Sequence, residues 1–281
     1  MLRVAVPNKG SLAEPASSML RESGYRQRTD TRELVLQDPD SDTEFFFLRP
    51  RDIAVYVGTG ELDVGITGRD LLLDSGAAAE EILSLGFAQS TFRFAARPGS
   101  ASTVQDFAGQ RVATSYGGLL AKFFAERGVD AEIIRLDGAV ETAVRLGVAD
   151  VIADVVSTGT TLRQAGLEIV GEPILESEAV LVRRSGAEAS PAVDQLVRRM
   201  QGVIIARRYV LMDYDVRSDL VEAAVRLTPG IESPTVSPLH EPGRNAVRAM
   251  VLRSETNRIM DELWELGARG ILVTDIHACR L

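Results

Sequence analysis

The chain has 281 residues and a formal net charge of −9, from 31 lysines and arginines against 40 aspartates and glutamates. One cysteine excludes a disulfide framework, and two histidines leave little for a zinc site or a histidine-based catalytic triad. The acidic balance disfavours general nucleic-acid binding. No apolar run reaches the roughly 18 residues of a membrane span, and the N-terminus lacks the apolar core of a signal peptide. We therefore expect a cytoplasmic protein of two or three domains. If it binds phosphates, it must do so at a local site whose charge is opposite in sign to that of the whole chain.

The N-terminal segment predicts a strand, a turn and a helix. Residues 2–6 alternate apolar side chains as a short strand does, and a turn containing Lys9 and Gly10 follows. Ser11 and Glu14 have the spacing of a capping box at a helix start. A strand end, a lysine and a helix start form a corner that favours anions. A solvated lysine in an ordinary strand-to-helix turn is the alternative that this segment leaves open.

The strand-and-helix pattern then repeats along the chain. The predicted strands that follow are residues 62–67, 111–114, 132–136 and 151–153. Helical patterns come between them, which predicts α/β layers with mostly parallel sheets and ligands at the carboxyl ends of the strands. Two further extended segments, 86–97 and 179–184, could carry the chain from one α/β lobe to a second and back. This arrangement predicts two lobes like those of periplasmic binding proteins, with a cleft between them.

The C-terminal part predicts a separate small domain. A long helical pattern begins at Ser190, and the tail from residue 209 has the order strand, helix, two strands, helix, strand. That βαββαβ order is the ferredoxin-like arrangement. The expected division is 1–90 with 184–211 for lobe I, 91–183 for lobe II, and 212–281 for the C-terminal domain.

The segment 150–162 carries the clearest chemical signal. A buried strand ends at Asp154, and a turn rich in hydroxyls and glycine follows at a predicted helix start. Hydroxyls and backbone N–H groups can surround a phosphate without adding positive charge. Asp154 could accept a sugar hydroxyl or help hold magnesium through its waters. The segment lacks the Gly-Lys-Ser/Thr of a Walker loop, and an ordinary Ser/Thr-rich turn remains the alternative.

Several motifs, in their order and spacing, make the chain resemble the long-form ATP phosphoribosyltransferase family, which catalyses the first step of histidine biosynthesis. The resemblance covers essentially the whole chain. It rests on residues 4–10, 49–53, 63–70, 137–141, 150–162 and the tail ending at Asp275 and Ile276. One departure is Ser11, where many short-form relatives carry an arginine.

The resemblance implies a pentosyl transfer that joins ATP to 5-phosphoribosyl 1-diphosphate, with Mg²⁺ accompanying the diphosphate. It implies that Asp154 binds the ribose hydroxyls and that Glu141 lies near the ribose. The residues expected to hold the 5-phosphate are Ser157, Thr158, Gly159, Thr160 and Thr161.

The resemblance also implies which residues meet the second substrate. Lys9 and Arg49 are assigned to diphosphate or triphosphate groups, and Asp70 and Tyr116 to the adenine nucleotide. Asp70 or Glu141 could polarise the amino group of the purine, so both are catalytic candidates beside Asp154. The alternatives are a solvated cation at Lys9 or Arg49 and an ordinary half-buried aromatic at Tyr116.

For the C-terminal domain, the resemblance implies binding of histidine as a feedback inhibitor and a homo-oligomer of dimers that assemble into hexamers, without a separate regulatory subunit. Asp215 is expected to face the ammonium or imidazole of the inhibitor, although a solvated acid is its alternative. The expected histidine site is Asp215, Ile231, Ser233, Thr235, Met250 and Gly270. Two other functions remain open from the sequence: a hinged binding protein without catalysis, and an amino-acid-sensing regulator.

Overall fold

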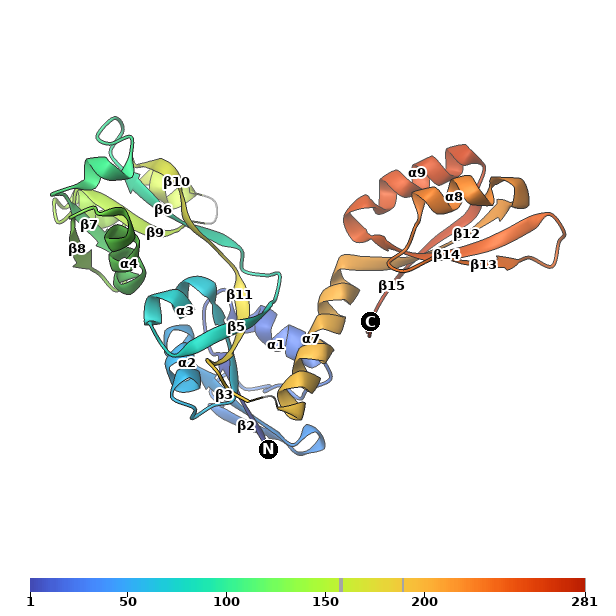
Figure 1. Cartoon of the computed structure of the whole chain (residues 1–281), viewed down its shortest axis with the longest axis horizontal. Coiled ribbons are helices and arrows are strands. Elements are labelled where there is room, and N and C mark those ends of the chain that lie inside the picture. Colours follow the sequence, from blue (N-terminus) through green and yellow to red (C-terminus); the bar gives the residue numbers. More distant parts are fainter. Residues whose placement is uncertain (157–158, 189, 281) are drawn as a thin grey trace. The chain divides into compact units, whose positions relative to one another are not determined.

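The computed structural model describes residues 1–156, 159–188 and 190–280. The chain divides into two compact units, one made of 1–21 with 25–194 and the other of 22–24 with 195–281. Within the described part of the chain, no helix is long and apolar enough to cross a membrane. Figure 1 shows that the first unit has two lobes, each a sheet with its helices, and that the second unit has a third sheet with helices of its own.

Lobe I of the first unit is built on a six-stranded sheet in the order β2-β3-β1-β4-β11-β5. Its strands are β1 (Leu2–Pro7), β2 (Val35–Asp38), β3 (Thr43–Leu48), β4 (Val64–Gly68), β5 (Ala79–Ser84) and β11 (Ala179–Arg184). Its helices are α1 (Ala13–Glu22), α2 (Pro50–Gly58) and α3 (Arg69–Ser75), with the 3₁₀ turn η1 (Pro39–Ser41). The core beneath α2 joins Ile53 and Val57 to Ala5 and Val180, so helix and sheet bury one another's apolar faces.

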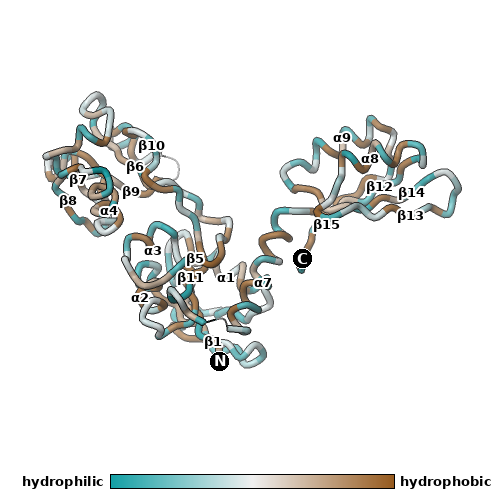
Figure 2. The backbone as a smooth tube through the Cα atoms, in the orientation of Figure 1, coloured by the Kyte–Doolittle hydropathy of each residue, from teal (hydrophilic) through white to brown (hydrophobic). Residues whose placement is uncertain are grey.

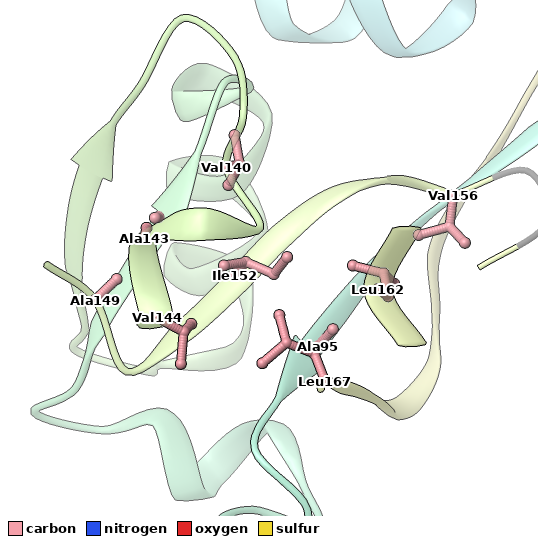
Figure 3. Close-up of a cluster of buried hydrophobic side chains, with 10 residues drawn as sticks. Ala95, Val140, Ala143, Val144, Ala149, Ile152, Val156, Leu162 and Leu167 are labelled. Carbon is pink, nitrogen blue, oxygen red and sulfur yellow. The ribbon is translucent and has the colours of Figure 1, made fainter. Parts of the chain in front are cut away.

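Lobe II is built on a five-stranded sheet in the order β10-β6-β9-β7-β8. Its strands are β6 (Ser90–Ala96), β7 (Arg111–Thr114), β8 (Glu132–Arg135), β9 (Val151–Val156) and β10 (Glu168–Ser177). Its helices are α4 (Gly117–Arg127), α5 (Thr142–Arg145) and α6 (Thr160–Gln164), with the 3₁₀ turn η2 (Val104–Phe107). Figure 3 shows Val144 of α5 and Leu162 of α6 packed beside Ile152 of β9, which fixes the strand that leads to the phosphate segment.

The two sheets are mixed, so the expectation of mostly parallel sheets is wrong. Strand β6 is antiparallel to both of its neighbours, and so is β11. Strand β6 is the first strand of lobe II and β11 brings the chain back to lobe I, so both follow a crossing between the lobes. Buried strands of either direction are apolar, so the residue pattern could not distinguish them. The predicted two-lobed α/β architecture is confirmed.

The second unit carries a four-stranded antiparallel sheet in the order β13-β14-β12-β15. Its elements are α7 (Pro191–Arg208), β12 (Tyr209–Arg217), η3 (Ser218–Leu220), α8 (Val221–Leu227), β13 (Thr235–Pro238), β14 (Arg244–Leu252), η4 (Arg253–Glu255), α9 (Thr256–Leu266) and β15 (Arg269–Asp275). Alternate residues of β12, such as Met212 and Tyr214, form a core with Ile259 and Leu263 of α9. The predicted βαββαβ fold is confirmed.

The boundaries between these parts differ from the expected ones. Strand β11 already lies in the sheet of lobe I, so the chain has returned by residue 179 and not by 184. Most of α7 belongs to the second unit. The reason is visible in its contacts, because the Arg253 Nε atom donates to the carbonyl oxygen of Arg207 at 3.1 Å and the carbonyl of Cys279 packs against Gly202.

The segment 33–58 folds into β2, β3 and α2, elements that no local residue pattern predicted. Proline at the first position of α2 suits a helix start, because that position has no intrahelical N–H bond to lose. Figure 2 shows hydrophobic residues along the strands and hydrophilic residues in connections such as that between β13 and β14. Strand β3 matters for the site because it ends next to Arg49.

Candidate active site

A cleft of about 860 Å³ lies between the two lobes of the first unit. All four residues that the sequence assigned to ATP and diphosphate line it, namely Lys9, Arg49, Asp70 and Tyr116. Lys9 and Arg49 are exposed to solvent within it, whereas Asp70 and Tyr116 are buried to 7% and 9% exposure. The cleft therefore combines accessible cations with a buried acid and an aromatic ring.

The topology of lobe I explains why residues so far apart in sequence meet. Strands β3, β1 and β4 are adjacent and parallel, so their carboxyl ends lie at the same edge of the sheet. Lys9 follows β1, Arg49 follows β3 and Asp70 follows β4. Ligands of α/β proteins bind at this edge.

Asp70 is fixed by a pair of hydrogen bonds with Ser177, the last residue of β10 in lobe II. The Ser177 hydroxyl donates to Asp70 Oδ1 at 2.9 Å and accepts from the Asp70 backbone N–H at 3.0 Å. Tyr116 hydrogen-bonds to the same carboxylate from lobe II. Burial and the Asp70 charge raise the pKa of Tyr116, so its hydroxyl stays protonated and can donate.

Arg51 is a cleft residue to which the sequence assigned no role. Its guanidinium carbon lies 4.5 Å from the centre of the Tyr116 ring. Its Nη1 and Nη2 atoms donate to the carbonyl and hydroxyl oxygens of Ser115, at 2.9 and 3.1 Å. Arg51 lies two residues after Arg49 in the first turn of α2, and that spacing of two arginines at a helix start was the available signal.

Asp154 lies half-buried within β9, which continues for two residues to the buried Val156, so the expected strand end at Asp154 is two residues early. Burial raises its pKa above the ordinary value of 3.8, and the negative charges of Glu141 and Asp70 raise it further. The hydrogen bond from the Val155 N–H and the charge of Arg51 act in the opposite direction. These interactions place the three expected catalytic acids within electrostatic range of one another.

We expect Asp154→Asn to stabilise the fold at neutral pH. Because the folded-state pKa of Asp154 is raised, the protein loses stability as pH rises from the unfolded-state value through the folded-state value. Asparagine avoids that loss, so the variant should match the native protein in acid and melt a few degrees higher at neutral pH, since ~1 kcal/mol shifts Tm by about 2–4 °C at this size. Thermal melts across this range check it, and a difference in Tm independent of pH would contradict it.

The phosphate segment is only partly within the described residues. Ser157 and Thr158 lie outside them. Gly159 is buried with φ of +68°, a conformation that favours glycine, and it precedes α6 as predicted. Thr160 and Thr161 are exposed in the first turn of that helix. The assignment of these five residues to the 5-phosphate stays a prediction.

The acids of the cleft offer oxygen ligands of the kind that Mg²⁺ takes. The negative charge of Glu141 helps to raise the pKa of Asp154, and a divalent cation bound nearby would relieve that repulsion. In the part of the chain that is described, no three His, Cys, Asp or Glu side chains come together as a metal-binding group. The carboxylate oxygens of these acids fit a magnesium ion that is bound mainly by substrate phosphates and water.

Three of the residues expected to bind the inhibitor histidine share one face of the sheet in the second unit. Asp215, Thr235 and Met250 occupy the face of the sheet opposite the core of α8 and α9, since the alternate positions of β12 and β14 are buried. Gly270 has φ of +60°, and a side chain there would contact the Asp215 carboxylate. Ile231 and Ser233 are exposed in the connection before β13. The structure thus places Asp215 beside Gly270, while a single histidine-binding site formed by all six residues stays a prediction.

The fold and the cleft define a two-lobed α/β protein with a ferredoxin-like C-terminal domain. The family model described as ATP phosphoribosyltransferase matches residues 49–202, and that of the HisG C-terminal domain matches 206–278. Relatives named ATP phosphoribosyltransferase from Arthrobacter sp. and Paenarthrobacter aurescens are 67% and 68% identical, with 100% of each chain covered.

A solved structure of the ATP phosphoribosyl transferase (HisG:HisZ) complex from Thermotoga maritima is similar in fold, with a TM-score of 0.63 and 26% identity. The match covers 73% of this chain and 98% of that one. The chain belongs to the ATP phosphoribosyltransferase family, and its activity is the pentosyl transfer to ATP that begins histidine biosynthesis.

Proposed function

We propose that the cleft joins ATP to 5-phosphoribosyl 1-diphosphate through the residues identified above, giving N1-(5-phosphoribosyl)-ATP and diphosphate. The observation that carries this proposal is the convergence of Lys9, Arg49, Asp70 and Tyr116 from four separate segments on one cleft. Cations suit the phosphate groups, and the buried Tyr116 ring beside Asp70 suits a purine with an amino group to donate.

The chemistry asks mainly for positioning and charge stabilisation. The adenine N1 attacks the anomeric carbon, the bond from that carbon to the diphosphate oxygen breaks, and diphosphate leaves with the electron pair. Positive charge develops on the sugar as the bond breaks, and a carboxylate beside the ribose stabilises it. We assign this role to Asp154, with Glu141 as its neighbour.

Asp70 is placed to act on the nucleophile. As N1 forms its new bond, the 6-amino group becomes more acidic, and a carboxylate that accepts its hydrogen bond stabilises the developing charge. Ser177 and Tyr116 both hydrogen-bond to Asp70 and hold its orientation. Mg²⁺, when bound with the diphosphate, would neutralise part of the charge of the leaving group.

The test of this function is turnover. The purified chain is mixed with ATP, 5-phosphoribosyl 1-diphosphate and Mg²⁺, and the product is followed by its absorbance and by the diphosphate released. We expect turnover that needs both substrates. Binding of either substrate without turnover would favour a hinged binding protein and contradict the proposal.

We further propose that histidine binds the C-terminal domain and inhibits the reaction in a homo-oligomer of this chain, without a separate regulatory subunit. The position of Asp215 beside Gly270, on a sheet face that its own helices leave open, supports it. An inhibitor acts in this way only by binding one arrangement of the enzyme more tightly than another.

Asp215→Asn is expected to weaken histidine inhibition about tenfold or more, because a hydrogen bond to a charged group contributes roughly 1.5–3 kcal/mol. The matched control is Asp219→Asn, which removes an exposed acid paired with Arg217 at 2.6 Å in the same domain. Inhibition curves for the native chain and both variants check the prediction. An unchanged inhibition constant in Asp215→Asn would show that the ligand lies elsewhere.

A further inference from the structure

The first turn of α4 in lobe II obtains its hydrogen-bond acceptor from lobe I. The backbone N–H groups of Gly118 and Leu119 donate to Asp74 Oδ1 at 2.9 and 3.1 Å. Asp74 belongs to α3, more than forty residues earlier. The residue before α4, Tyr116, makes no side-chain cap of its own. Helices usually obtain this acceptor from the residue at their start, so here the cap exists only while the two lobes are in contact.

The same carboxylate holds Arg51 against Tyr116. Asp74 Oδ2 lies 3.3 Å from Arg51 Nη1, and the Asp74 side chain is only 15% exposed. Arg51 in turn donates to Ser115 and covers the Tyr116 ring at 4.5 Å. One acid in lobe I therefore connects to the helix start and to the aromatic residue of lobe II.

The close approach of the two helices depends on a glycine. A side-chain carbon at Gly118 would collide with the backbone carbonyl oxygen of Asp74. The contact therefore needs both the carboxylate of Asp74 and the absence of a side chain at Gly118.

We propose that Asp74 is a positioning residue for ATP, which ties α3 to α4 and holds Arg51 and Tyr116 at the adenine side of the cleft. The proposal rests on the proposed function in that Tyr116 meets the adenine nucleotide. Asp74 itself does not line the cleft and acts through Arg51 and α4.

Four variants of the full chain test the proposal. Asp74→Ala removes both acceptors, Asp74→Asn keeps a carbonyl oxygen for the α4 amides without the charge, and Gly118→Ala separates the helices without changing any charge. The matched control is Asp106→Ala, because the Asp106 carboxylate also accepts from two backbone N–H groups, those of Ser102 and Thr103 at 2.8 Å, but within lobe II alone.

Two measurements are made on each folded variant. The first is amide hydrogen exchange of Gly118 and Leu119 without substrates, which reports the contact directly. We expect exchange to accelerate at least tenfold in Asp74→Ala and Gly118→Ala and to stay near the native rate in Asp74→Asn and Asp106→Ala.

The second measurement is steady-state kinetics with calorimetric ATP binding. We expect the KM and dissociation constant for ATP to rise about tenfold in Asp74→Ala and Gly118→Ala, with the KM for the phosphoribosyl donor within twofold of native and partial recovery in Asp74→Asn. Unchanged exchange, or unchanged ATP affinity despite faster exchange, would overturn the proposal. Absence of turnover in the native chain would count against the function alone, because exchange and ATP binding are read without turnover.

Discussion

Asp154→Ala is expected to lower kcat/KM for 5-phosphoribosyl 1-diphosphate by about 10²–10³-fold, the range that removal of one preorganised electrostatic group costs an enzyme. The carboxylate lies half-buried near the end of β9 and accepts a hydrogen bond from the Val155 N–H at 2.8 Å, so it is already oriented before substrate arrives. Alanine removes the negative charge that would face the developing positive charge on the ribose.

The kinetic pattern separates this role from a general loss of structure. Asp154→Ala and Thr161→Ala should both raise the KM for the phosphoribosyl donor more than that for ATP, because both residues belong to the segment assigned to the donor. Asp150→Ala is a matched control, since Asp150 comes just before the same strand and its carboxylate pairs at the surface with Arg111 at 2.9 Å. Equal effects on the two substrates would show that the segment does not bind the donor.

The sequence predicted the parts of the fold that repeat a local pattern. Strands such as β7 and β11 and the whole βαββαβ tail have apolar residues at a period that local reading detects. The segment 33–58 was missed because β3 carries three consecutive phenylalanines, alternately buried and half-buried, and α2 begins with a proline rather than a capping residue. The antiparallel direction of β6 and β11 could not be predicted, because buried strands are apolar whichever way they run.

The same distinction applies to the site. Lys9 and Asp70 follow strands that the sequence predicted, so the rule for ligands at strand ends indicated their neighbourhood, whereas Arg49 follows the unpredicted strand β3 and was assigned through the family resemblance alone. Ser177, Arg51 and Asp74 act through partners in other elements: Ser177 is 107 residues from Asp70, and Asp74 is 44 from Gly118. Such contacts depend on how the lobes fold together, and no local pattern encodes them.

The negative charge of the chain fits this site. A protein at −9 repels polyanions at long range, so its substrates must be held by a few placed groups. The cleft supplies exposed cations at Lys9 and Arg49, and we propose that Asp154 faces the sugar and Asp70 the purine amino group. Substrates that enter with magnesium carry less charge, which reduces the repulsion that the surface presents.

Asp70→Asn is expected to lower kcat about 10²-fold, within the range that a positioned proton acceptor contributes, with the KM for the phosphoribosyl donor within about twofold of native. Asparagine has the same size and can still hydrogen-bond to Ser177, so the fold should be retained. It lacks the charge that stabilises the 6-amino group as N1 bonds to the sugar, so the chemical step should slow.

The matched control is Ser177→Ala, which removes both hydrogen bonds between Ser177 and Asp70 but leaves the carboxylate in place. We expect a loss of about tenfold or less, because the Asp70 charge remains and Tyr116 still orients it. Single-turnover kinetics with both substrates bound distinguishes slower chemistry from slower product release. If Asp70→Asn kept a native single-turnover rate while Ser177→Ala lost more, Asp70 would hold the structure of the cleft and not act on the adenine.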